Sequence, residues 1–109
     1  VSANGLLFIS GTLSVDAAFQ TLAPGDMRGQ LEVVYAALGE TLAAHGLDFA
    51  AVVKETVFVT DMDAFLDAND FRLGIYAGRD LPAVTAVEVR RLAFPANLVE
   101  IEVVAILAG

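Results

Sequence analysis

The amino-acid sequence predicts an α+β domain in which a mixed β-sheet carries two helices on one face. Three observations lead to this prediction. Apolar residues recur every three or four positions after Asp26, which is the spacing of an amphipathic helix. The segments 52–60 and 98–107 have the composition or alternation of strands. The predicted order ββαβαββ separates the helices by strands, and this order is typical of a sheet covered on one side.

The chain is expected to begin with two strands and a loop. A buried strand covers 6–10 and ends at Gly11, and residues 12–16 are expected to form its hairpin partner. The segment 15–25 has no regular period and contains the turn signal Pro24-Gly25. We therefore expect a loop or hairpin between the first strands and the first helix.

The first helix has clear predicted ends. Asp26 is a suitable N-cap because its carboxylate can accept a hydrogen bond from a free N–H of the first turn. Gly46 suits the left-handed position that follows a helix. The apolar face between them consists of Met27, Leu31, Val34, Leu38 and Leu42. The single histidine, His45, lies in the last turn, and nothing in the sequence completes a catalytic triad around it. We expect it to be a surface or capping residue.

Four further elements are predicted after this helix. They are a strand over 52–60, a helix from Asp61 or Asp63 to about Tyr76, a strand over 83–92 after Pro82, and a strand over 98–107. Asn69 falls within the second helix, and we expect its side chain to hydrogen-bond a neighbouring loop rather than a ligand. The uncovered face of the sheet needs cover, which a small protein can obtain by forming an oligomer.

Composition limits the domain count and the partners. The 109 residues fit one domain spanning 1–109. Hydrophobic residues make up 57% and charged residues 18%, which is apolar for a small monomer, so we expect apolar surface to be buried between subunits. The net charge of −8, with one basic pair at Arg90-Arg91, argues against nucleic acid and anionic membranes as partners.

Several classes of site have no signal in this sequence. Cysteine is absent and histidine occurs once, so thiolate catalysis is excluded and a transition-metal site is not expected. No phosphate-binding loop or dinucleotide fingerprint occurs, so no cofactor is expected. The sequence has neither a signal-peptide pattern nor an apolar stretch long enough to span a bilayer. We therefore expect a soluble cytoplasmic protein.

The last predicted strand carries the sharpest local signal. Alternation places Glu100 and Glu102 on one face, opposite Val99, Ile101 and Val103. Two interpretations of these carboxylates are open. Either this face is solvated or salt-bridged, or one carboxylate positions or activates a water molecule near a subunit boundary.

Short motifs that together are typical of one protein family occur along nearly the whole chain. In order they are Gly5 to Gly11, Gln30, His45 to Asp61, Phe65 with Asn69, Pro82 to Thr85, Ala86 to Val89 and Val99 to Ala105. In their order and spacing they resemble the reactive-intermediate deaminase (RidA/YjgF) family. The resemblance implies a chorismate-mutase-like (YjgF-like) fold. It also implies a homotrimer whose sheets line a central barrel, with ligand clefts between neighbouring subunits.

The resemblance also implies a chemistry. Deaminating members of the family hydrolyse 2-imino acids to 2-keto acids and ammonia without a cofactor. The family's water-positioning glutamate corresponds to Glu100, its turn serine to Ser10, and the residue after its carboxylate-binding arginine to Thr85. The position of the arginine itself is Val84, a substrate-binding position whose side chain has no donor for a carboxylate.

Two functions are therefore open at the level of sequence. One is a RidA-like imine or enamine hydrolase with altered substrate preference, in which Glu100 orients water while Ser10 and Thr85 hydrogen-bond the substrate. The other is a non-catalytic homotrimer that binds a small metabolite or a partner in the same clefts. We expect a small-molecule ligand at the subunit interfaces.

Overall fold

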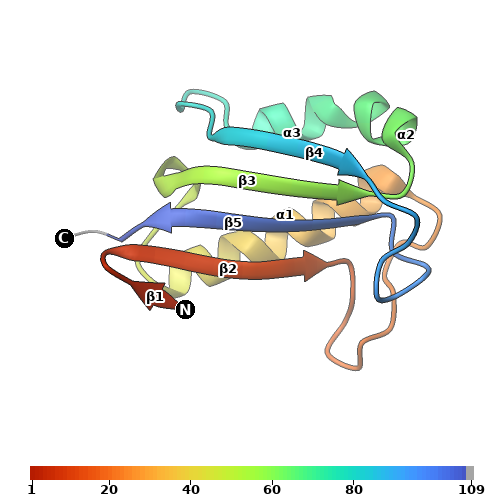
Figure 1. Cartoon of the computed structure of the whole chain (residues 1–109), viewed down its shortest axis with the longest axis horizontal. Coiled ribbons are helices and arrows are strands. Elements are labelled where there is room, and N and C mark those ends of the chain that lie inside the picture. The colour runs from red at the N-terminus through yellow and green to blue at the C-terminus, as the bar shows by residue number, and fades with distance from the viewer. Residues whose placement is uncertain (108–109) are drawn as a thin grey trace.

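A computed structural model, which describes residues 1–107, shows a five-stranded mixed sheet with its helices on one face (Figure 1). The strand order is β1-β2-β5-β3-β4. The strands are β1 (Ser2–Ala3), β2 (Leu6–Leu13), β3 (Val52–Val59), β4 (Ala83–Glu88) and β5 (Val99–Ile106). The helices are α1 (Met27–Ala44), the short 3₁₀ helix η1 (Phe49–Ala51), α2 (Met62–Asp67) and α3 (Asn69–Ile75). The predicted α+β class is confirmed.

Helix α1 begins and ends where the sequence predicts. The Asp26 carboxylate accepts a hydrogen bond of 3.0 Å from the N–H of Gly29. Gly46 has a φ of 71°, and its N–H donates to the carbonyl of Ala43, which closes the helix in a left-handed cap. His45 is the exposed C-cap residue, and its Nδ1 lies 2.9 Å from the carbonyl oxygen of Thr41. The capping role predicted for His45 is confirmed.

The N-terminal strand pairing differs from the prediction. β2 does not end at Gly11 but continues to Leu13, so the expected hairpin partner over 12–16 is wrong. The register between β2 and β5 shifts between Ile9 and Thr12, and this bulge lets the strand continue through the glycine. The actual hairpin partner is β1, which precedes β2 across a tight turn at Asn4-Gly5 with both φ angles positive.

The predicted second helix is divided at Ala68. The N–H of Ala68 is shared between the carbonyls of Ala64 and Phe65, at 3.2 and 3.1 Å, which tightens the turn and ends α2. Asp61 is the N-cap of α2, since its carboxylate accepts from the N–H of Ala64. Asn69 therefore begins α3. Its Oδ1 is buried without a hydrogen-bond partner within residues 1–107, so the expected bond to a loop is not formed.

The fourth strand is shorter than the predicted range 83–92, because β4 ends at Glu88. The chain then enters a loop in which the guanidinium of Arg91 donates to the carbonyls of Leu92 and Ala93. A side chain that binds its own loop stabilises the loop conformation rather than an extended strand. The final strand agrees with its prediction to within one residue at each end.

The two faces of the sheet differ sharply. Along β5, Val99 and Ile101 are buried in the core, while Glu100 and Glu102 lie on the other face, as alternation predicts. The helices cover only the first face (Figure 1), and we call the second one the open face. No helix in the part of the chain that the structure describes is long and apolar enough to cross a membrane.

Candidate functional site

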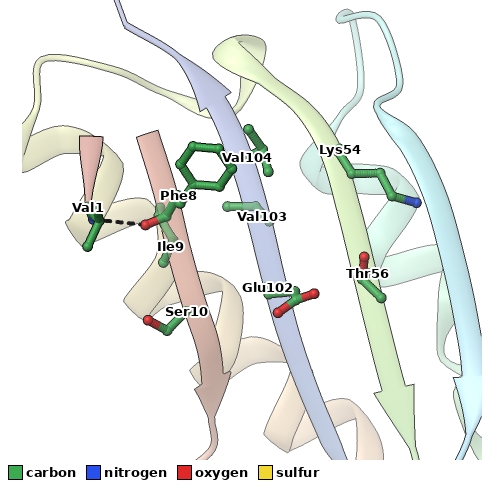
Figure 2. A pocket seen from close by; sticks show the side chains of 9 residues that line it. All are labelled: Val1, Phe8, Ile9, Ser10, Lys54, Thr56, Glu102, Val103 and Val104. Atoms are coloured by element: carbon green, nitrogen blue, oxygen red, sulfur yellow. Dashed lines mark hydrogen bonds between the residues drawn. The ribbon is translucent and has the colours of Figure 1, made fainter. Parts of the chain in front are cut away.

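The open face carries a cavity of about 360 Å³ that is lined by residues of several strands (Figure 2). Its polar side chains are Ser10 from β2, Lys54 and Thr56 from β3, and Glu102 from β5. The remaining lining residues are apolar and comprise Val1, Phe8, Ile9, Val103 and Val104. A few polar groups within an apolar surround are typical of a small-molecule site.

Strand register aligns the polar residues into a band. Glu102 pairs with Thr56, and Thr56 pairs with Thr85 on β4. Paired residues on neighbouring strands share a face, so all three lie on the open face. Ser10 lies beside Glu102 in the bulged part of β2. The band therefore crosses the sheet from β2 to its far edge at β4.

Glu100 lies on the same face, and its carboxylate sits over Gly11. A β-carbon at Gly11 would overlap Oε1 of Glu100 and would lie 3.0 Å from its Cγ. Glycine is therefore needed here to let the side chain approach the backbone, and its φ is not positive. Ser10 precedes this glycine, so the structure brings Ser10 and Glu100 into neighbouring positions. Glu102, rather than Glu100, lines the cavity with Ser10.

The two other predicted site residues lie on β4, at the opposite edge of the sheet. Thr85 is on the open face, and its Oγ1 accepts a hydrogen bond of 2.8 Å from Nζ of Lys54. Val84 pairs with Glu55, whose side chain is buried under the helices, so Val84 points to the helix-covered side of the sheet, but at the edge strand β4 it is still 40% exposed. Three strand spacings of about 4.8 Å separate β2 from β4. One chain therefore does not bring Ser10 together with Thr85 or Val84.

Comparison with known proteins decides the family. Residues 1–107 match the family model described as Endoribonuclease L-PSP. This chain belongs to that family, which is also known as RidA/YjgF. The 2-iminobutanoate/2-iminopropanoate deaminase of Mus musculus is 35% identical over 106 residues, covering 97% of this chain and 77% of the mouse protein. Protein DfrA of Myxococcus xanthus is 36% identical over 106 residues, covering 97% of this chain and 79% of that protein.

Solved structures of RidA/YjgF proteins have the same fold. The crystal structure of the YjgF gene product from E. coli matches with a TM-score of 0.85 at 28% identity, covering 97% of this chain and 84% of that one. The Rid-family protein YyfA from Yersinia pestis matches with a TM-score of 0.90 at 29% identity, covering 97% and 83%. The YjgF-like fold expected from the sequence is confirmed.

The covered face of this RidA/YjgF protein contains a charged cluster that the sequence did not reveal. Glu55 is fully buried, and its carboxylate accepts hydrogen bonds from three side chains. The donors are Tyr35 Oη at 2.8 Å, Arg72 Nε at 2.6 Å and Tyr76 Oη at 2.5 Å. A glutamate in a run of β-branched residues is usually exposed, and only the packing of α1 and α3 under β3 shows otherwise.

Burial and charge shift the titration of this cluster. Burial raises the pKa of Tyr35 and of Tyr76 far above the ordinary tyrosine value, and the negative charge of Glu55 raises both further. Burial acts to lower the pKa of Arg72, but the charge and hydrogen bond of Glu55 outweigh it and raise that pKa overall. The cluster lies on the opposite face from the cavity, so we assign it a structural role.

Lys54 and Thr56 are cavity residues that the sequence analysis did not single out. Alternation along β3 places them on one face and Glu55 on the other. The sequence alone gave no reason to bury the face with the glutamate instead of the face with the lysine. Within residues 1–107, no cluster of histidine, cysteine, aspartate and glutamate could hold a metal ion.

Proposed function

We propose that this RidA/YjgF protein is a cofactor-independent hydrolase that converts 2-imino acids or their enamines to 2-keto acids and ammonia. One observation carries the proposal: the Glu100 carboxylate is packed over Gly11, directly beside Ser10, on a sheet face that no described helix covers. The deaminases of 2-iminobutanoate and 2-iminopropanoate among its relatives support the reaction class.

Imine hydrolysis requires an oriented water molecule and a group that moves protons. In the addition step, the water oxygen bonds to the imine carbon, and one water proton passes through Glu100 to the imine nitrogen. In the elimination step, the proton of the new hydroxyl passes by the same route to nitrogen. The C–N bond then breaks as the carbonyl forms, and ammonia leaves. No oxidant or reductant takes part, so water is the sole co-reactant.

The proposed site is shared between subunits of a homotrimer whose three sheets line a central barrel. Ser10 and Thr85 both hydrogen-bond the substrate in this proposal, yet they lie about 14 Å apart across one sheet. A small substrate can reach both only if the β4 edge of one subunit adjoins Ser10 and Glu100 of the next. Exposed apolar side chains on the open face support such an assembly; Phe8 is 45% and Ile106 52% exposed.

Val84 modifies the substrate preference in this proposal. Its side chain stands where the family resemblance implies an arginine that binds the substrate carboxylate. A valine offers neither charge nor hydrogen-bond donor, so an anionic substrate loses a charge-assisted pair at this position. We therefore expect weaker binding of simple 2-imino acids than in an enzyme with the arginine.

A second function is a non-catalytic trimer that binds a small metabolite in the same clefts. Two observations favour it. Val84 offers no group that could bind a substrate carboxylate, and the carboxylate that lines the cavity with Ser10 is Glu102 instead of Glu100. In this function the polar band would hold a ligand without activating water.

The test is hydrolysis of freshly generated 2-iminobutanoate and 2-iminopropanoate, measured as 2-keto acid formed. We expect activity in the unmodified chain, a rise in kcat/KM with Val84→Arg, and a fall of about 100-fold or more in kcat with Glu100→Gln. Glu32→Gln is the matched control, because Glu32 is an exposed glutamate on α1, and it should leave the rate unchanged.

The outcomes separate the two functions. Activity confined to Val84→Arg would mean that the catalytic groups are intact but that the natural substrate is not a simple 2-imino acid, which would contradict the proposed substrate class. Activity absent from both proteins would contradict the hydrolase and favour the binding protein. The trimer is tested by light scattering on the purified chain. A mass near 11.4 kDa, that of one chain, would exclude the trimer and the shared site with it.

A further inference from the structure

A substrate such as 2-iminobutanoate carries a carboxylate, and a carboxylate in a protein cleft needs a positive charge or several donors. Val84 provides neither. The chain has six cationic side chains, all of them within residues 1–107. The positions of these six side chains in the structure show which of them can reach a ligand on the open face.

Three of the six already have a carboxylate partner. They are Arg28 with Asp70 at 2.5 Å, Arg72 with Glu55 at 2.6 Å, and Arg79 with Asp48 at 4.0 Å. Arg90 and Arg91 lie in the loop beyond β4, where Arg91 donates to carbonyls of its own loop. Lys54 is the sixth, and among these residues it alone lines the cavity of the open face.

The ammonium of Lys54 lies at the edge of the sheet. Lys54 is on β3 and pairs with Ala83 on β4. Figure 2 shows its side chain extending away from Glu102 and toward β4, where Nζ donates to Oγ1 of Thr85 at 2.8 Å. No ion pair within residues 1–107 involves this ammonium. The positive charge of Lys54 therefore lies next to Thr85, the residue that follows Val84 in the chain.

We propose that Lys54, together with Thr85, is the anchor for the carboxylate of the ligand. An ammonium has three N–H donors, and Thr85 accepts one of them, which leaves two for a ligand. Because the Thr85 oxygen accepts from Lys54, the Thr85 hydroxyl proton is available to the same carboxylate. The two side chains together offer a charge and a second donor at one point of the β4 edge.

The anchor differs from an arginine in what it recognises. An ammonium is a compact charge that lacks the planar fork with which arginine binds both carboxylate oxygens. We therefore expect the site to separate a carboxylate from an uncharged carboxamide and to be tolerant of how the carboxylate is oriented. The inference rests on the proposed function only for the identity of the substrate, since carboxylate binding can be measured without turnover.

The test measures binding of 2-oxobutanoate, the expected product, by NMR titration of the full chain. Lys54→Met should weaken binding about tenfold or more, whereas Lys54→Arg should stay within about threefold. Arg28→Met removes the same charge from α1, on the covered face, and should leave binding unchanged. The neutral analogue 2-oxobutanamide should bind the unmodified chain about tenfold more weakly than 2-oxobutanoate, and this difference should disappear in Lys54→Met.

Turnover is measured separately on the same variants. Equal binding of 2-oxobutanoate by the unmodified chain and Lys54→Met would overturn the anchor, and so would a lack of binding to the unmodified chain at millimolar concentration. If Lys54→Met loses binding while no variant hydrolyses imines, the anchor stands and the hydrolase fails. If imines are hydrolysed with an unchanged KM in Lys54→Met, the hydrolase stands and the anchor fails.

Discussion

The carboxylate of Glu100 occupies the space that a side chain at Gly11 would fill. The contact joins the bulge of β2 to the neighbouring strand β5 at the candidate site. The absence of a side chain at residue 11 thus determines where the carboxylate lies. A change at this glycine should affect function more than folding, because the far end of a glutamate can move.

Gly11→Ala should displace the Glu100 carboxylate and lower imine hydrolysis strongly, at a cost of about 1–3 kcal/mol in the free energy of unfolding. Thermal unfolding and the imine assay measure the two effects. Combining the alanine with Glu100→Ala should recover most of the lost stability, because the overlapping group is gone. Gly39→Ala is the control; its β-carbon would meet Phe49 at an ordinary 3.5 Å and should stabilise α1 by about 0.5–1 kcal/mol.

Glu55→Gln should be among the most destabilising single changes in this chain. It removes the charge that faces the buried guanidinium of Arg72, and breaking a buried pair in this way costs about 3–5 kcal/mol. Urea denaturation measures the loss. Adding Arg72→Met should recover part of it, since no unpaired charge then stays buried. Asp70→Asn, at the exposed pair with Arg28, should change stability little, and a loss equal to that of Glu55→Gln would contradict the argument.

The two tyrosines of the chain should make it sensitive to alkali. Both Tyr35 and Tyr76 have a pKa raised in the folded state, mainly by burial. Their contribution to stability is fully present below the unfolded pKa of about 10 and is lost as the pH rises above it. Each pH unit above that value should lower the free energy of unfolding by up to about 1.4 kcal/mol per tyrosine.

The sequence makes this alkaline effect easy to follow, because the chain has two tyrosines and no tryptophan. The near-ultraviolet absorbance of tyrosinate should appear together with loss of the helical circular dichroism signal. Tyr76→Phe should reduce the dependence of stability on pH by about half. Tyrosinate absorbance that develops in the folded protein at its ordinary pH would show that these hydroxyls are not held as described.

Gln30 should be needed to hold the start of β5 in place. Its Nε2 donates to the carbonyls of Ala23 and Ala96, and its Oε1 accepts from the N–H of Leu98. Gln30→Leu would leave these partly buried backbone groups without their side-chain partner, at a cost of about 1 kcal/mol or more. Hydrogen exchange at the Leu98 amide should accelerate in this variant. Unchanged protection of that amide would mean that Gln30 does not position the strand that carries Glu100.

Local chemistry accounts for the elements that were predicted correctly. The cap of α1 depends on Asp26 and Gly46, which act on backbone groups within one turn, so the sequence around them was sufficient. The faces of β5 followed from alternation, because each side chain points opposite to its neighbour. The break at Ala68 and the end of β4 at Glu88 were missed, because no glycine or proline marks either position.

The sequence by itself determined the fold class, the ends of α1, the shared face of Glu100 and Glu102, and the family that the comparison then established. Only the tertiary structure decided that Glu55 is buried and that Lys54 reaches Thr85. It also decided that Ser10 and Thr85 lie at opposite ends of one sheet. The physical reason is that these relationships join strands far apart in the chain, where register and bulges, rather than local propensity, determine which side chains meet.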